Sequence, residues 1–286
     1  MKFRIKRKTL YGYMFILPWL IGFLALVLWP LIQSFYFSLN SMRITPVGLQ
    51  YKYVGFNNFR DVWLKDMFFI QELLQFLIDT VLRVPVIVVF ALMMAILLNE
   101  KVRGKATFRT IFFLPVIVAS GPVIDQLINQ GAATIPMVDQ ATIMGLLTQF
   151  LPNWIAQVVS DLFTQIIIIL WYSGVQILLF LAVLQKIDPN LYEAAKIDGG
   201  SAWECFWKIT LPTIKPIILV NLIYTLVALA NSEQNPIISL IYANMFSATR
   251  GYGFASAMAW MYALIIAILL LIIFLIFRER KPKRRS

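Results

Sequence analysis

The stretch that decides the fold is EAAKIDGGSAWECFWKITLP, residues 193–212. It combines acids, paired glycines and an amphipathic pattern, and it lies between two long apolar segments. Those segments are hydrophobic enough to lie in lipid, whereas this stretch is suited to water. The sequence therefore predicts a membrane protein with an exposed loop between two of its helices.

Helical spacing within this loop predicts two short helices joined by glycines. The first covers residues 190–197 and stops at the pair Gly199–Gly200, because glycines favour a helix end. Ser201 and Glu204 form a capping box that starts the second helix, which Pro212 is expected to break. The second helix has an apolar face formed by Trp203, Phe206, Trp207 and Ile209. An interfacial linker would show the same spacing, so spacing alone leaves both interpretations open.

The composition predicts an all-α, polytopic membrane protein. The 286 residues are 60% hydrophobic and 14% charged, with a mean hydropathy of +0.78. A bilayer core requires about 20 apolar residues per helix. Six runs meet that length: 11–39, 76–98, 108–128, 155–184, 214–242 and 254–277. We expect one membrane domain over residues 1–286, with residues 190–212 as a loop within it.

The distribution of basic residues predicts the topology. Most of the 25 lysines and arginines lie in four clusters, at residues 1–8, 101–109, 186–215 and 278–285. Segments with few basic residues alternate with these clusters, as the positive-inside rule requires. Both termini and the 190–212 loop are therefore expected in the cytoplasm. The net charge of +11 reflects topology and does not indicate nucleic-acid binding.

The residue inventory excludes several chemistries. The chain has no histidine and one cysteine, Cys205, so it contains no disulfide, no Cys/His zinc site and no Ser–His protease. Cys205 is expected to pack as a small apolar residue. Gly104-Lys105-Ala106 does not complete a phosphate-binding loop. We therefore expect no cofactor in this chain, no metal site and no enzymatic activity.

The central loop resembles the EAA loop of ABC importer permeases. Glu193-Ala194-Ala195, Gly199 and Ile209-Thr210-Leu211-Pro212 occur at that family's spacings, between predicted helices four and five. Four further segments resemble the carbohydrate-uptake branch, which includes maltose-type and glycerol-phosphate-type permeases: WPLIQSFYFSL, YVGFNNF, LLNEKVRGKATFRTIFFLP and WYSGVQILLFLAVLQKIDPNLYEAAKIDGG. The resemblance therefore covers nearly the whole chain. The outer loop at 243–253 departs from it, because the family's Gly-Gly-Pro run is missing there, so a binding-protein contact at this loop is not predicted.

The resemblance implies the type I importer permease fold and a loop that docks into a cytoplasmic ATPase. Small Ala194 and Ala195 would allow close approach, Glu193 would accept bonds from a basic groove, and Gly199 would supply the bend. The ATPase-coupling residues implied are Glu193, Ala194, Ala195, Asp198, Gly199, Ile209, Leu211 and Pro212.

The resemblance also implies an assembly in a prokaryotic cell membrane. The partners are a second permease, a paralogue in preference to an identical copy, and two ATPase subunits that bind ATP and Mg²⁺. An extracytoplasmic solute-binding protein delivers the solute. One six-helix chain would form half of the translocation pathway.

Polar and aromatic residues inside the predicted helices mark a candidate substrate pathway, because such residues are costly in lipid. The set consists of Trp171, Tyr172, Gln176, Asn221, Tyr224, Asn231 and Gln234. Rings and amides suit a carbohydrate, and we expect an oligosaccharide. Hydrogen bonding between helices is the simpler interpretation for any one of these residues. Asp79 and Arg83 are expected to pair one helical turn apart, and the role of Asp125 is left open.

Three other functions compete with this prediction. An ion-driven secondary transporter would favour inverted internal repeats, which are not detectable in this sequence. An ABC permease for another polar solute, such as glycerol phosphate, fits the same loop. A membrane enzyme is disfavoured, because the helices contain neither histidine nor clustered carboxylates.

Overall fold

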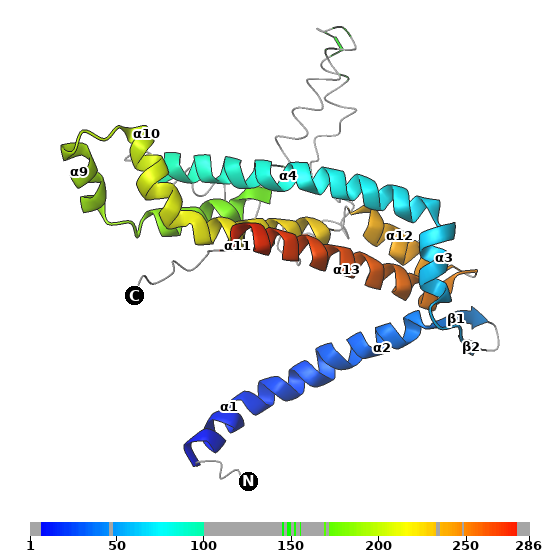
Figure 1. Ribbon diagram of the computed structural model, residues 1–286. Coiled ribbons are helices and arrows are strands. Elements are labelled where there is room, and N and C mark those ends of the chain that lie inside the picture. The colour runs from blue at the N-terminus through cyan, green and yellow to red at the C-terminus, as the bar shows by residue number, and fades with distance from the viewer. Residues whose placement is uncertain are drawn as a thin grey trace. The chain divides into compact units, whose positions relative to one another are not determined.

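The computed structural model describes residues 7–45, 48–99, 172–232, 235–247 and 249–278, and the positions 145, 148–149, 152, 155 and 169. The described chain is predominantly helical (Figure 1). It divides into two compact units, Met1–Leu77 with Asn231–Ile268 and Ile78–Ala230 with Leu269–Ser286. The helices α4 and α13 each contribute residues to both units.

The first unit begins with one long apolar segment. Its elements are α1 (Arg7–Phe23), η1 (Leu24–Leu28) and α2 (Trp29–Ser38). Pro18 lies inside α1, and η1 is a π-helical turn that ends two residues before Pro30. Proline has no backbone N–H to donate, so a widened turn beside it is an expected accommodation.

A small hairpin and a short helix follow. β1 (Asn40–Thr45) pairs antiparallel with β2 (Gly48–Tyr53), with Asn40 opposite Tyr53. The next element is α3 (Asn57–Lys65). Asn58 Nδ2 donates to the carbonyl oxygens of Ser38 at 2.8 Å and Asn40 at 3.0 Å. This amide therefore fixes α3 to the junction of α2 and β1, and the all-α prediction needs one correction for the two-stranded sheet.

Three more helices contribute to the first unit: the start of α4 (Met67–Asn99), α12 (Pro236–Met245) and most of α13 (Gly251–Phe277). The helix predicted at 76–98 thus begins nine residues earlier than expected. The reason is the cap at Asp66, whose Oδ1 accepts the N–H of Phe69 at 3.0 Å. Phe69, Val62, Ile237 and Met258 are among the fully buried side chains of this unit.

The second unit contains the rest of α4, the helix Tyr172–Leu184, α9 (Pro189–Ile197), α10 (Ala202–Cys205), η2 (Phe206–Thr210), α11 (Leu211–Ala230) and the end of α13. Its apolar core includes Ile87, Ala91, Ala95, Ile177, Phe180, Leu184, Ile187, Ile214 and Leu226. Ala91 and Ala95 are one turn apart on α4 and completely buried. Small residues at such positions allow helices to approach closely.

Four described helices are long and apolar enough to cross a membrane: Met14–Ser38, Met67–Asn99, Ala202–Ala230 and Gly251–Phe277. The predicted helix at 155–184 is described as a continuous helix over Tyr172–Leu184, and the isolated described positions 155 and 169 are also helical. The predicted helix at 108–128 and Asp125 lie outside the described residues.

The predicted helix at 214–242 is wrong as one continuous element. α11 ends at Ala230, and α12 begins at Pro236. Pro236 cannot donate a helical hydrogen bond, and Asn235 caps the new helix by accepting the N–H of Ile237 at 3.0 Å. Asn235 Nδ2 also donates to the Tyr262 hydroxyl at 2.7 Å, which ties the start of α12 to α13.

A glycine contact provides a test of the first unit's packing. A Cβ at Gly253 of α13 would lie 1.8 Å from the carbonyl oxygen of Asn40. We predict that Gly253→Ala lowers stability by about 1–3 kcal/mol or more, since overpacking forces the backbone apart. Thermal unfolding in detergent measures the effect. Gly22→Ala is the control, because nothing lies within 4 Å of its added Cβ. Equal melting temperatures for the two variants would contradict this close contact.

Candidate functional site

The centre of the candidate site is the end of α9. Asp188 caps its start, with Oδ1 accepting the N–H of Asn190 at 3.0 Å. At its end Gly199 adopts φ +82° and donates to Lys196 O at 3.1 Å. Gly200 then donates to Ala195 O at 2.8 Å. These two bonds form a Schellman motif, so the predicted glycine stop is confirmed.

A capping box starts the next helix immediately after the glycines. The Ser201 N–H donates to Glu204 Oε2 at 3.0 Å, and the Glu204 N–H donates to Ser201 Oγ at 3.3 Å. Glu204 Oε1 also accepts from Lys208 Nζ at 3.2 Å. The capping box predicted from the sequence is therefore confirmed, and only the short stretch 198–201 separates the two helices.

The predicted break at Pro212 is wrong. α10, η2 and α11 form one helical run from Ala202 to Ala230. In η2 the Leu211 N–H reaches back five residues to Phe206 O, which widens the turn just before the proline and makes room for its ring. The Thr213 hydroxyl donates to Ile209 O at 2.7 Å, so a side chain satisfies one carbonyl near the disturbed turn.

We call residues 188–212 the elbow, because α9 and α10 meet there at the glycine turn, at one end of the helices of their unit (Figure 1). A hydrogen bond closes the elbow: the hydroxyls of Tyr192 and Thr210 lie 2.8 Å apart. Tyr192 and Ile209 pack against the apolar core of the second unit, and Cys205 is buried, as predicted for a packing residue. Both α9 and the α10–η2 segment are thus fixed to the core of the second unit.

The exposed surface of the elbow contains most of the predicted coupling residues. Glu193, Ala194, Asp198, Gly199 and Pro212 are exposed, whereas Ala195, Ile209 and Leu211 are partly buried. Apolar Ile197 is also 87% exposed at the end of α9. A shallow groove of about 350 Å³ lies inside the bend, lined by Ala195, Asp198, Gly199, Gly200, Glu204, Cys205, Lys208 and Ile209. This surface offers carboxylates, a flat small-residue face and an apolar tip, which suit protein docking.

The predicted pathway residues differ in their exposure to solvent. Gln176 and Asn221 are fully buried in the second unit, Tyr172 is partly buried, and Tyr224 and Asn231 are exposed. Trp171 and Gln234 lie outside the described residues. The structure therefore does not bring these side chains to one described surface.

The buried amides are incompletely satisfied. Gln176 Nε2 donates to Thr225 Oγ1 at 2.8 Å, and that hydroxyl donates to Asn221 O at 2.7 Å. Among the described residues, Gln176 Oε1 and both polar atoms of the Asn221 side chain have no hydrogen-bond partner. Each such atom costs about 1–3 kcal/mol. Sequence reasoning missed Thr225, although it lies one turn after Asn221.

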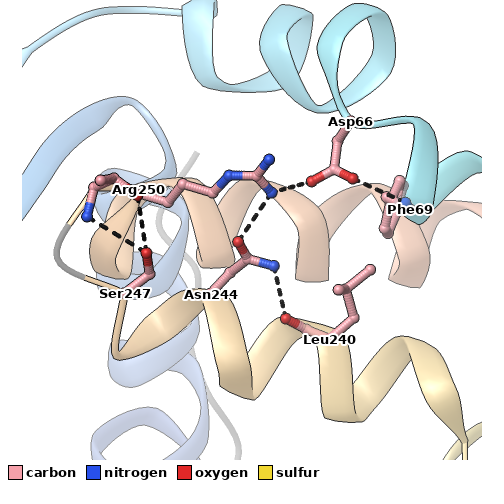
Figure 2. Close-up of polar contacts among 7 residues, drawn as sticks. Asp66, Phe69, Leu240, Asn244, Ser247 and Arg250 are labelled. Carbon is pink, nitrogen blue, oxygen red and sulfur yellow. Dashed lines mark hydrogen bonds and ion pairs between the residues drawn. The ribbon is translucent and has the colours of Figure 1, made fainter.

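A second polar cluster, in the first unit, was also missed from the sequence. Arg250 Nη1 donates to Asp66 Oδ2 and to Asn244 Oδ1, the latter at 3.0 Å (Figure 2). The Asp66 side chain is 1% exposed, and the Arg250 guanidinium also lies over the Phe254 ring at 4.8 Å. This ion pair connects the cap of α4 to the turn before α13. The predicted Asp79–Arg83 pair is confirmed at 3.5 Å.

No group of three or more His, Cys, Asp or Glu in the described ranges could hold a metal ion.

Residues 64–282 match the family model described as "Binding-protein-dependent transport system inner membrane component". The chain belongs to this family. The predicted resemblance to ABC importer permeases is thus confirmed.

Individual relatives agree with this family assignment. The chain is 29% identical to the probable ABC transporter permease protein YesP of Bacillus subtilis (strain 168), over 94% of this chain and 91% of that one. It is also 29% identical to the lactose transport system permease protein LacF of Rhizobium radiobacter, over 94% and 95% of the two chains. A solved bacterial alginate ABC transporter, in complex with an alginate pentasaccharide-bound periplasmic protein, has a similar fold. Its TM-score is 0.62 at 22% identity, with 95% of each chain covered.

The family assignment determines the class of protein. This inner-membrane component is a multi-pass protein of the bacterial cell membrane and a transport subunit, not an enzyme. Its transport depends on a binding protein, as the family's description states.

The Asp66–Arg250 pair in this permease can be tested by mutation. We predict that Arg250→Ala destabilises the fold by about 3–5 kcal/mol, because it leaves the buried Asp66 carboxylate without its cation. Lys65→Ala is the matched control. Its ion pair with Asp61 is exposed, so its loss costs about 1 kcal/mol or less. Denaturant or thermal unfolding in detergent compares the two, and equal small losses would contradict the role of Arg250.

Proposed function

We propose that this permease couples ATP hydrolysis in partner subunits to the import of a carbohydrate, an oligosaccharide, and that the elbow is the coupling element. The observation that carries the proposal is the elbow's combination of exposure and fixation. Its docking residues Glu193, Ala194 and Asp198 are exposed, whereas Tyr192 and Ile209 pack against the core of its unit.

The elbow connects directly to a membrane-spanning helix. Ala202–Ala230 is one 29-residue helical run, about 43 Å long at 1.5 Å per residue. A displacement applied to α9 passes through the glycine turn and the Tyr192–Thr210 bond into this run. The proposed mechanism is therefore rigid transmission: closure of the ATPase subunits moves α9, and α11 follows.

The proposed assembly has two permeases, two ATPase subunits and a solute-binding protein. The partner permease is a paralogue in preference to an identical copy, and the ATPases bind ATP and Mg²⁺. Each permease would cross the membrane six times with both termini in the cytoplasm, as the basic clusters favour. The described residues bury none of the most apolar window of Met14–Ser38, so this segment is available to lipid or to the second permease.

Carbohydrate as the substrate class rests on the relatives and on the available side chains. LacF is named for lactose transport, and the alginate transporter was solved with a pentasaccharide. Amides such as Gln176 and Asn221 pair with hydroxyl groups, and aromatic rings such as Tyr172 and Tyr224 stack on sugar faces. We propose that these residues line the pathway when it opens.

The coupling role predicts uncoupled variants. Glu193→Lys reverses the charge that meets the ATPase groove, and Gly199→Leu forces a side chain into φ +82°. Both variants are expected to insert normally, retain ATP hydrolysis and reduce sugar uptake in proteoliposomes by about tenfold or more, as the loss of a charge-assisted contact implies. Uptake and hydrolysis are measured in the same preparation.

Lys186→Glu is the control for charge. Lys186 is exposed near the same loop but precedes the elbow, and its reversal should leave coupling intact. Wild-type uptake by both elbow variants would count decisively against the coupling proposal.

Asn221 distinguishes a pathway residue from a packing residue. Its two side-chain polar atoms are buried without a described partner, so Asn221→Leu should raise thermal stability by about 1–3 kcal/mol. If Asn221 lines the open pathway, uptake falls although stability rises. An unchanged uptake rate in the stabilised variant would exclude Asn221 from the pathway.

A further inference from the structure

The α10–η2 segment of the elbow carries an aromatic patch outside the core. Trp203, Phe206 and Trp207 form this patch, and their ring centroids lie between 5.3 and 6.4 Å apart. Trp203 is 70% exposed and Trp207 is 49% exposed. The rings therefore contact one another more than they contact the apolar core.

The π-helical turn η2 determines which way the patch faces. Trp207 and Trp203 precede the buried Ile214 by 7 and 11 residues, which in a regular α-helix would place all three on one face. The five-residue hydrogen bond from Leu211 to Phe206 adds one residue to the turn and rotates the preceding residues by about 100°. The shift brings Phe206 toward the face of Ile214, and Phe206 is partly buried beside the buried Cys205, whereas the two tryptophans are exposed.

Helix length places the patch relative to the membrane. α11 has 20 residues, about 30 Å, which matches the thickness of the hydrocarbon core. It ends at Ala230, and the exposed Asn231 follows. α10 and η2 therefore extend beyond the hydrocarbon at the other end, where the headgroups lie. Trp207 is four residues from α11, about 6 Å along the axis.

Two exposed lysines follow the patch along the same helical run. Lys208 pairs with Glu204, and both side chains are exposed at the rim of the elbow's groove. Lys215 is exposed one turn into α11, where a long side chain reaches back to the headgroups. Tryptophan is enriched at this depth, and lysine is attracted to anionic lipids.

We propose that Trp203 and Trp207, with Lys208 and Lys215, form a binding surface for anionic phospholipid headgroups of the inner leaflet. The assignment of this surface to the inner leaflet rests on the proposed function, which places the elbow on the cytoplasmic side of the membrane. The surface fixes the depth of α11, so that a push on α9 tilts the helix about this level and does not slide it along the membrane normal. The π-helical turn serves this role because it turns the tryptophans from the core to the lipid.

Tryptophan fluorescence in vesicles tests the proposal. The chain is reconstituted into phosphatidylethanolamine–phosphatidylglycerol vesicles with Trp203 or Trp207 as the single tryptophan and phenylalanine at every other tryptophan position. Quenching is measured with lipids brominated near the headgroup, with lipids brominated near the chain end, and with aqueous iodide. The control is Ile197→Trp in a background without other tryptophans, since Ile197 is 87% exposed at the end of α9.

The expected result is stronger quenching by the shallow bromolipid than by the deep one, with iodide quenching several-fold weaker than in the control. Iodide quenching equal to the control would overturn the proposal and assign the patch to a protein or aqueous surface. Stronger quenching by the deep bromolipid would overturn it as well, because the rings would then lie in the hydrocarbon.

Two further measurements keep the test decisive. If the single-tryptophan chains do not fold, Trp203→Phe and Trp207→Phe are made in the otherwise natural chain. The difference in bromolipid-quenched fluorescence between the natural chain and each variant then reports the depth of the tryptophan that was replaced. Vesicles without phosphatidylglycerol test the lysines, and weaker shallow quenching is expected there. None of these readouts requires transport, so a negative result would leave the coupling tests on Glu193 and Gly199 unaffected.

Discussion

Two glycine amides hold the turn on which the rest of the site depends. Gly199 and Gly200 donate to the carbonyls of Lys196 and Ala195, and Ser201 begins a new helix directly after them. Gly199 needs φ +82°, and a Cβ at Gly200 would lie 2.8 Å from Ala195 O. Glycine at both positions therefore gives a tight reversal with its backbone groups bonded. The proposed coupling role requires a stiff elbow, and this geometry favours one.

The helical run Ala202–Ala230 meets three structural requirements together. It starts at the glycine turn, passes a proline without breaking, and ends after a length suited to the bilayer. The π-helical turn η2 makes the first two compatible, because it relieves Pro212 and turns the tryptophans outward while Cys205 packs inside. Elsewhere in the unit, the buried amides Gln176 and Asn221 keep unbonded atoms. We interpret that local cost as a sign that this layer rearranges when the pathway opens.

Much of the elbow could be predicted from sequence, because its signals are local. The glycine stop and the capping box each depend on residues within a few positions of one another, and apolar run length identified the membrane class. Some of the misses had non-local or compensated causes. Pro212 was expected to end a helix, but a widened turn accommodates it. The break before Pro236 has a local signal in the polar run 231–235, but two of those residues were assigned to a substrate pathway inside one helix. The Asp66–Arg250 pair joins residues 184 positions apart, and no periodicity reports such a contact.

The rigidity of the elbow is best tested by a distance within it. Spin labels at Leu191 on α9 and Thr213 on α11, both exposed, in a Cys205→Ala background, allow that distance to be measured by pulsed electron resonance in the assembled transporter. If the elbow moves as one body, the distance distribution is the same without nucleotide and with ATP bound. A shifted or second distance in the ATP state would show that the turn bends under load, and would contradict the account of α9 and α11 as one rigid coupling element.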